Sequence, residues 1–220
     1  QEGAPETAAA GAPAEGVPAQ AAKRSVYFWM IVFGTLLITS AGSFNAHLSP
    51  MGISYGYGAR IGALLVSCSM AGNVLSKNLL GILYDHLGLR RALIFGVGAS
   101  ALGCALLLID SVPVRVIGAF LFGSAMGTNN VATPLVIKDV FGLRDYGELL
   151  SYNTLFMTFG NSLALLFGGV MVDAFGAQRG YFLSFVIVLC MLALLAVLYA
   201  VAVRGGRRLR SKYDAVSSPQ

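Results

Sequence analysis

One motif occurs twice in this chain, with identical internal spacing and an offset of 88 residues. Each copy reads G-N-x₇-G-x₃-D-x₂-G-x₂-R, where x is any residue. An internal repeat constrains the architecture strongly, because equivalent residues are expected to occupy equivalent structural positions. The first copy consists of Gly72, Asn73, Gly81, Asp85, Gly88 and Arg91, and the second of Gly160, Asn161, Gly169, Asp173, Gly176 and Arg179.

The composition places this repeat in a membrane. Hydrophobic residues make up 56% of the chain and charged residues 11%, whereas a soluble domain averages about 25% charged residues. Stretches such as 92–109 and 182–203 have no polar face, which argues against a soluble helical bundle. A hydrocarbon core of about 30 Å takes about 20 residues to cross, and six segments are long enough. They lie near 25–48, 58–84, 91–110, 113–139, 146–173 and 179–203.

Three of these segments separate equivalent points of the two motif copies. An odd number of crossings puts the copies on opposite faces of the bilayer, as in many secondary transporters. We therefore predict an all-α membrane protein with six transmembrane helices, arranged as an inverted pair of three-helix units.

The segments outside the spans define the domains and the orientation. Residues 1–22 are almost wholly Ala, Pro, Gly, Gln and Glu, which bury too little apolar surface to become ordered. We expect a disordered cytoplasmic linker or tail at 1–24, a transmembrane domain at 25–203 and a basic cytoplasmic tail at 204–220. In this orientation eleven Lys and Arg residues are cytoplasmic and three are external. The bias predicts a multi-pass protein of the plasma membrane with both termini in the cytoplasm.

The repeated motif has the residues of a conformational switch. Gly81 and Gly88 permit a tight turn between the second and third predicted helices. Asp85 would lie at the C-terminal end of its helix, where the helix dipole disfavours an anion, so it needs a positive partner. Arg90, Arg91 or the N-terminus of a neighbouring helix could supply one. Such a contact can break and re-form between two states. The same role is assigned to the second copy, at Gly169, Asp173 and Gly176.

The first loop resembles a signature of the major facilitator superfamily, G-x-L-x-D-x-x-G-[RK]-[RK]. Here it reads Gly81-Ile-Leu-Tyr-Asp85-His-Leu-Gly88-Leu-Arg90-Arg91, with Leu89 in place of the usual basic residue. That family has twelve helices in two halves, so the resemblance implies that this chain is one half. The stretch 134–147 and the second motif copy are similar to loops of the monocarboxylate and oxalate/formate branches. The resemblance thus implies a C-terminal half, completed by an N-terminal half, although dimerisation with a second copy remains open.

Lys77 is the one charged residue that lies deep within a predicted span, away from its ends. It is four residues from both Asn73 and Gly81, so the three share a helix face. An intramembrane lysine is a functional candidate by default. The oxalate/formate branch carries N-x-x-x-R-x-x-x-G-x-x-x-D at a similar place, and this resemblance implies that Lys77 holds the carboxylate of an anionic substrate. The alternative is that Gly81 marks the membrane surface, about 6 Å along the helix, and that Lys77 reaches the headgroups.

Other polar residues within spans are weaker candidates for substrate binding. Asn129, Asn130 and Asn161 could bind a substrate or could join helices by hydrogen bonds. The segment 146–173 contains no Lys or Arg, which favours a monoanion over a dicarboxylate held at both ends.

We therefore expect half of a secondary active transporter, which moves a small organic anion, a monocarboxylate, by alternating access. Coupling to protons stays open. The alternative is a transporter-like membrane receptor or scaffold without flux. The chain has no HExxH, no GxSxG and no paired intramembrane aspartates, so we do not expect an enzyme. We also expect no metal, no cofactor and no nucleic-acid partner. The expected partners are the substrate and the lipid bilayer.

Overall fold

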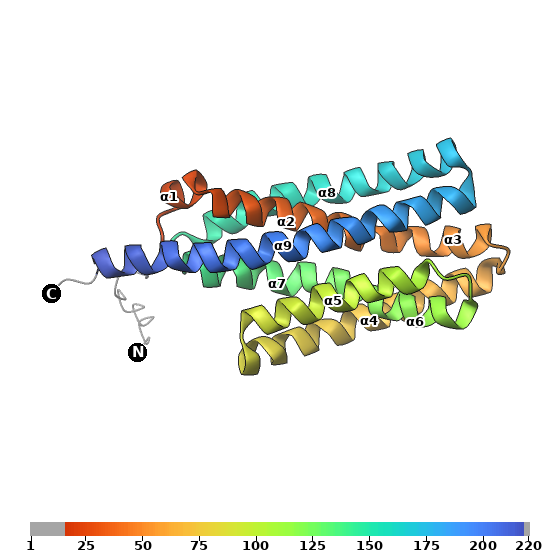
Figure 1. The fold of residues 1–220 in the computed structure, drawn as a ribbon, viewed down its shortest axis with the longest axis horizontal. Helices are drawn as coiled ribbons and strands as arrows, with labels where there is room; N and C mark the ends of the chain where they lie inside the picture. Colours follow the sequence, from red (N-terminus) through yellow and green to blue (C-terminus); the bar gives the residue numbers. More distant parts are fainter. Residues whose placement is uncertain (1–15, 218–220) are drawn as a thin grey trace, which may run out of the picture.

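The computed structural model describes residues 16–217, and the elements of regular structure within them are helices (Figure 1). This confirms the predicted all-α class. In chain order the elements are α1 (Ala19–Arg24), α2 (Val26–Ser43), a 3₁₀ turn η1 (Phe44–His47), α3 (Leu48–Ser54), α4 (Gly58–Leu87), α5 (Leu89–Leu107), α6 (Val112–Phe122), α7 (Ser124–Phe141), α8 (Tyr146–Phe175) and α9 (Ala177–Ser217).

Five stretches of helix in the described part of the chain are long and apolar enough to cross a membrane: Val26–Ser54, Gly58–Leu87, Leu89–Leu107, Tyr146–Phe175 and Ala177–Ser211. They correspond to five of the six predicted spans. The remaining prediction, 113–139, falls on α6 and α7, which are separated by the single residue Gly123. With 11 residues α6 is too short to cross, and α7 is less apolar because it contains two asparagines, Lys138 and Asp139.

The long helices run back and forth along the long axis of the bundle (Figure 1). We call the end that holds α1 and the C-terminal part of α9 the terminus end, and the other the far end. The α4–α5 turn lies at the terminus end, and the α8–α9 turn lies at the far end. The two copies of the repeated motif therefore lie at opposite ends of the bundle.

Small residues allow α6 and α7 to approach α4 closely. A side chain on Gly123 would overlap the backbone of Ser69, and a side chain on Gly127 would overlap the hydroxyl of Ser76. A small-xxx-small pair is a common packing face between membrane helices. The interruption at Gly123 thus falls where the backbone of this region approaches the backbone of α4 closely.

The two ends of the chain differ from the predicted domain pattern. Residues 1–15 lie outside the described residues, but residues 19–24, expected to be disordered, form α1. The backbone N–H of Ala19 donates to Asp145 at 2.6 Å, and Lys23 pairs with Glu148 at 2.5 Å. Specific polar contacts with α8 and the loop before it thus order this segment, although its composition offers too little apolar surface for it to become ordered by burial alone. The basic segment after residue 204 continues α9 to Ser217.

Candidate functional site

A polar cavity of about 340 Å³ lies between α2, α7 and α8. Each helix contributes residues three or four positions apart, which places them on one face. No charged side chain lines the cavity. The lining residues are Thr39, Gly42 and Ser43 from α2, Met126, Asn129 and Asn130 from α7, and Thr154, Met157, Thr158 and Asn161 from α8.

Hydrogen bonds between helices orient two of the asparagines. The hydroxyl of Thr39 donates to Oδ1 of Asn129 at 3.0 Å, and the hydroxyl of Ser43 donates to Oδ1 of Asn161 at 2.5 Å. Within the described part of the chain, no hydrogen bond uses the Nδ2 atoms of these two asparagines. Their amide N–H groups can therefore donate to a solute that carries oxygen acceptors.

The exposed surface of α8 has two sides of different chemistry. Ser151, Thr154, Thr158 and Ser162 are exposed, and each hydroxyl donates to the carbonyl four residues earlier, at 2.8 to 3.2 Å. The other exposed side is formed by large apolar residues. The apolar side suits contact with lipid, whereas the hydroxyl side adjoins the polar cavity, which Thr154 and Thr158 line. The apolar residues are Tyr152, Leu155, Phe159, Leu163, Leu166 and Val170.

The structure brings together three of the five predicted substrate residues. Asn129, Asn130 and Asn161 line the same cavity, whereas Asn73 and Lys77 do not. Asn73 is buried on the side of α4 that packs against Gly123 of the α6–α7 junction, and its Oδ1 has no hydrogen-bond partner. Lys77 is half-buried one turn further along α4.

Lys77 lies far from the end of its helix. After Gly81, α4 continues for six residues to Leu87, so Lys77 is about 15 Å from the helix end. Half of a hydrocarbon core of about 30 Å spans the same distance. The ion pairs of the described residues are Lys23–Glu148, Asp110–Arg115 and Asp139–Arg207, and none involves Lys77. Gly81 therefore lies within α4 and not at its end.

The glycines of the two motif copies have matching environments. Gly88 and Gly176 both end a long helix with a positive φ, +78° and +77°, which favours glycine. A side chain on Gly72 would overlap the backbone carbonyl of Phe120 in α6. A Cβ on Gly160 would lie 2.9 Å from the carbonyl oxygen of Leu36 in α2. Gly81 and Gly169, by contrast, both face open space.

Within residues 16–217, Asp85 forms no ion pair with the partners expected for it. Asp85, Arg90 and Arg91 are all exposed at the α4–α5 turn, and no ion pair joins them in the described residues. Asp173 in the second copy is likewise exposed and outside the ion pairs described above. The tight turns of the motif are present, and in the part of the chain that the structure describes no ion pair accompanies them.

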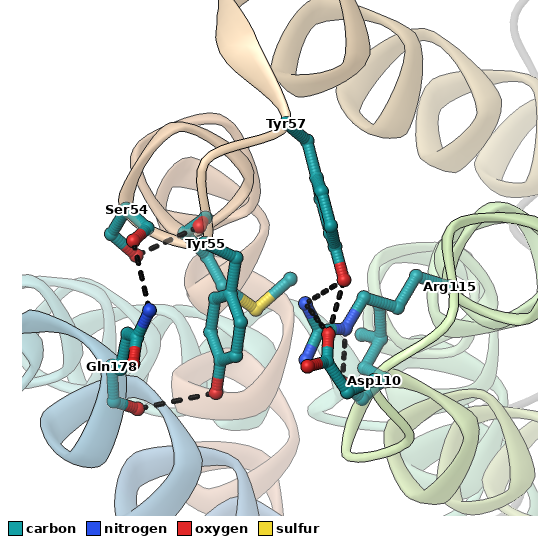
Figure 2. Close-up of polar contacts among 8 residues, drawn as sticks. Ser54, Tyr55, Tyr57, Asp110, Arg115 and Gln178 are labelled. Carbon is teal, nitrogen blue, oxygen red and sulfur yellow. Dashed lines mark hydrogen bonds and ion pairs between the residues drawn. The ribbon is translucent and has the colours of Figure 1, made fainter.

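A polar cluster at the far end joins both halves of the bundle (Figure 2). Its centre is Arg115 of α6, which is 1% exposed. The guanidinium donates to Tyr57 Oη at 3.0 Å and to the carbonyl of Leu107 at 3.3 Å, and lies 3.3 Å from Asp110. It also lies 3.8 Å from the centre of the Tyr55 ring. We name Ser54, Tyr55, Tyr57, Asp110, Arg115 and Gln178 the Arg115 cluster.

The cluster extends from the α3–α4 turn to α9. The hydroxyl of Tyr55 donates to the carbonyl of Gln178 at 3.3 Å, and the Gln178 amide donates to the carbonyl of Ser54 at 3.4 Å (Figure 2). Burial and a hydrogen bond to Asp110 raise the pKa of Tyr57 above its ordinary value. The rings of Tyr55 and Tyr57 both lie beside the guanidinium of Arg115.

Sequence reasoning missed the Arg115 cluster. Arg115 counted only as an external basic residue, near the outer end of the fourth predicted span, 113–139. The available signal was the pair Asp110 and Arg115, which flank Pro113 at the start of a helix. Nothing in the local sequence places Tyr55 and Tyr57 beside them, because 58 residues separate Tyr57 from Arg115.

Arg115→Ala should lower the stability of the purified protein by about 2–4 kcal/mol, because it removes charge-assisted hydrogen bonds and a desolvated cation–π contact. Asp110→Asn should cost much less, since the Asp110 side chain is 70% exposed. Arg60→Ala, which changes an exposed arginine of α4, should stay within about 0.5 kcal/mol of the parent. Thermal unfolding in one detergent measures all three, and equal losses for Arg115 and Arg60 would contradict the structural role.

Comparison with known proteins agrees with this fold. Residues 28–218 match the family model of the Major Facilitator Superfamily. YwtG of Bacillus subtilis (strain 168), named as a metabolite transport protein, is 27% identical over 154 residues, 68% of this chain and 33% of that protein. An Arabidopsis thaliana protein named as inositol transporter 3 is 28% identical over 117 residues, 53% of this chain and 20% of that protein. The chain thus matches a third or less of the length of these relatives.

The fold also resembles a solved transporter structure. The inward open conformation of the xylose transporter XylE from E. coli superposes with a TM-score of 0.65 at 15% identity, over 86% of this chain and 54% of that one. At this identity the similarity concerns the fold alone. The family match covers nearly all of the described helices, and the chain therefore belongs to the Major Facilitator Superfamily, as an integral multi-pass membrane protein.

Proposed function

We propose that this chain is one half of a secondary active transporter that moves a small organic anion, with a monocarboxylate as the expected class, by alternating access. Membrane transport is supported by the family and the relatives. In this proposal α6 and α7 together form the remaining membrane span, which is the fourth in chain order. The other half is an N-terminal unit or a second copy, and the termini face the cytoplasm across the plasma membrane.

The pattern of contacts between helices supports an inverted repeat, and with it the half-transporter architecture. The first unit comprises α2 to α5 and the second α6 to α9. In this arrangement α2 corresponds to α6 with α7, α4 to α8, and α5 to α9. The close contact between α2 and α8 then corresponds to the contact of α4 with α6 and α7. The contact between α2 and α9 corresponds to the contact of α5 with α6 and α7. The paired glycines and the opposite positions of the two motif turns follow the same relation. Alternating access by rocking of repeats needs this kind of internal symmetry.

The position of Lys77 is the observation on which the proposal of an anionic substrate rests. A lysine at the centre of a membrane helix costs about 2.5–3.5 kcal/mol by insertion scales, so its presence there points to a function. It is half-buried and lacks an ion-pair partner in the described residues. A carboxylate would offset the cost, and the attraction would strengthen as the closing cleft excludes water. The anion then favours the closed state because it binds that state more tightly.

A neutral, polyhydroxylated solute is the second candidate. The cavity between α2, α7 and α8 has amide and hydroxyl groups and no charge, which suits a solute with many hydroxyls. One relative is named for inositol and the structural neighbour for xylose. In this alternative the asparagines bind the solute and Lys77 does not take part.

The test is uptake by the complete transporter reconstituted in vesicles, with radiolabelled small monocarboxylates and small polyols, with and without a pH gradient. The proposal predicts uptake of a monocarboxylate that unlabelled monocarboxylates inhibit and polyols do not. If the vesicles take up a polyol but no acid, the second candidate replaces the proposal. Binding of either solute without flux would favour the receptor or scaffold alternative. Stimulation by the pH gradient would identify protons as the coupling ion.

A further inference from the structure

A second cavity, of about 400 Å³, forms a groove between α5 and α9, two helices that do not line the polar cavity. Its floor consists of buried apolar side chains, including Leu93, Val97 and Leu192. Small residues on both helices leave the space open, notably Gly98 and Ala196. A pocket of this size is within the usual range for small-molecule sites, about 300–1,000 Å³.

Two arginines line the groove. Arg90 stands at the start of α5 and Arg204 lies on the last apolar stretch of α9, so both belong to the terminus end. Both are exposed, and neither takes part in an ion pair of the described residues. Arg207, three residues after Arg204, is paired with Asp139 at 2.7 Å. The two groove arginines thus keep their charge available, whereas a neighbour on the same helix does not.

We propose that this groove binds an anionic phospholipid, with the phosphate held between Arg90 and Arg204 and one acyl chain lying along the groove. Both helices are long and apolar enough to cross a membrane, so an apolar groove on their outer side would contact lipid. Guanidinium groups bind phosphate through paired, charge-assisted hydrogen bonds. Basic pockets between membrane helices on the cytoplasmic side are known to bind anionic headgroups. The site requires membrane insertion and the orientation proposed above, but not the substrate assignment.

The first test removes the charges. The complete protein is purified from membranes that contain phosphatidylglycerol and phosphatidylcholine with identical acyl chains, and native mass spectrometry counts the retained lipids. Wild type should retain phosphatidylglycerol in preference, and the double variant Arg90→Gln/Arg204→Gln should reduce that retention about tenfold or more. The matched control Arg24→Gln/Arg144→Gln removes the same charge from exposed residues of α1 and of the loop before α8, away from the groove, and should change retention less than twofold.

The second test fills the groove. Gly98→Leu should fold well, because a Cβ at Gly98 meets nothing within 4 Å and leucine favours a helix over glycine. The leucine side chain would occupy the place of the acyl chain, so phosphatidylglycerol should no longer raise the Tm of this variant. Without lipid, the Tm of the variant should be no lower than that of wild type. Gly147→Leu, at another open position in the first turn of α8, should keep the lipid-induced rise.

Several outcomes would overturn the lipid site. Equal retention of the two lipids by wild type would do so, as would equal losses in the groove variant and the charge-matched control. A Tm rise of the same size with inorganic phosphate alone would show a free-anion site instead. An unchanged response of Gly98→Leu to phosphatidylglycerol would show that the groove does not hold the lipid. The uptake assays of the substrate proposal are independent of these readouts.

Discussion

Lys77→Gln should lower monocarboxylate uptake by the complete transporter about tenfold to a hundredfold. Glutamine keeps much of the length and polarity of lysine but removes the charge. A hydrogen bond to a charged group contributes about 1.5–3 kcal/mol, and about 1.4 kcal/mol corresponds to tenfold in affinity. The loss should be largest at low substrate concentration, where uptake depends on affinity. Uptake kinetics over a wide range of substrate concentration would measure it.

Two controls separate the charge of Lys77 from general damage. Lys77→Arg keeps a cation at the same place and should retain substantial uptake, although its planar group imposes a different geometry on the carboxylate. Lys138→Gln removes an exposed lysine from the end of α7 and should leave uptake near that of wild type. If Lys77→Gln transports the acid as well as wild type at every concentration, the anion-binding role is wrong. Unchanged polyol uptake in that variant would then favour the neutral solute.

Gly72→Ala should destabilise the purified protein by about 1–3 kcal/mol, which is the usual cost of overpacking. The added Cβ would overlap the carbonyl of Phe120, and backbone cannot rotate away as a side chain can. Gly160→Ala should destabilise in the same direction but less, because its Cβ would lie 2.9 Å from the carbonyl oxygen of Leu36. Thermal unfolding of the two variants beside wild type measures the difference.

The same motif supplies the controls for these glycines. Gly81→Ala and Gly169→Ala place a Cβ in open space, so they should gain helix propensity, up to about 1 kcal/mol, with no clash. The repeat thus predicts losses at its first glycine and no loss at its second, in both copies. If alanine at Gly72 were as harmless as alanine at Gly81, the described approach of α4 to α6 would be incorrect.

Much of the fold follows from local properties of the sequence. Five of the six predicted spans correspond to helices long and apolar enough to cross a membrane. The glycines that end α4 and α8 were identifiable because a tight turn after a long helix needs a residue that tolerates positive φ. The break at Gly123 was not predicted, because it depends on how closely α4 approaches the α6–α7 region rather than on the residues of that region.

The candidate site could be predicted only in part. Asn129, Asn130 and Asn161 were identifiable as polar residues within apolar spans, and the structure places them in one cavity. The sequence could not indicate that Lys77 lies outside that cavity, or that Thr39 and Ser43 orient the asparagines. Those relations join residues about 90 and 118 positions apart, through helix packing.

The sequence alone determined that the protein is a helical membrane protein with an internal repeat, because hydrophobicity, segment length and glycine turns act within a few residues. Only the tertiary structure decided which faces of the helices meet. Membrane helices are apolar on most sides, so their pattern does not distinguish a helix contact from a lipid contact. The burial of Arg115, the polar cavity and the groove between α5 and α9 all depend on that choice.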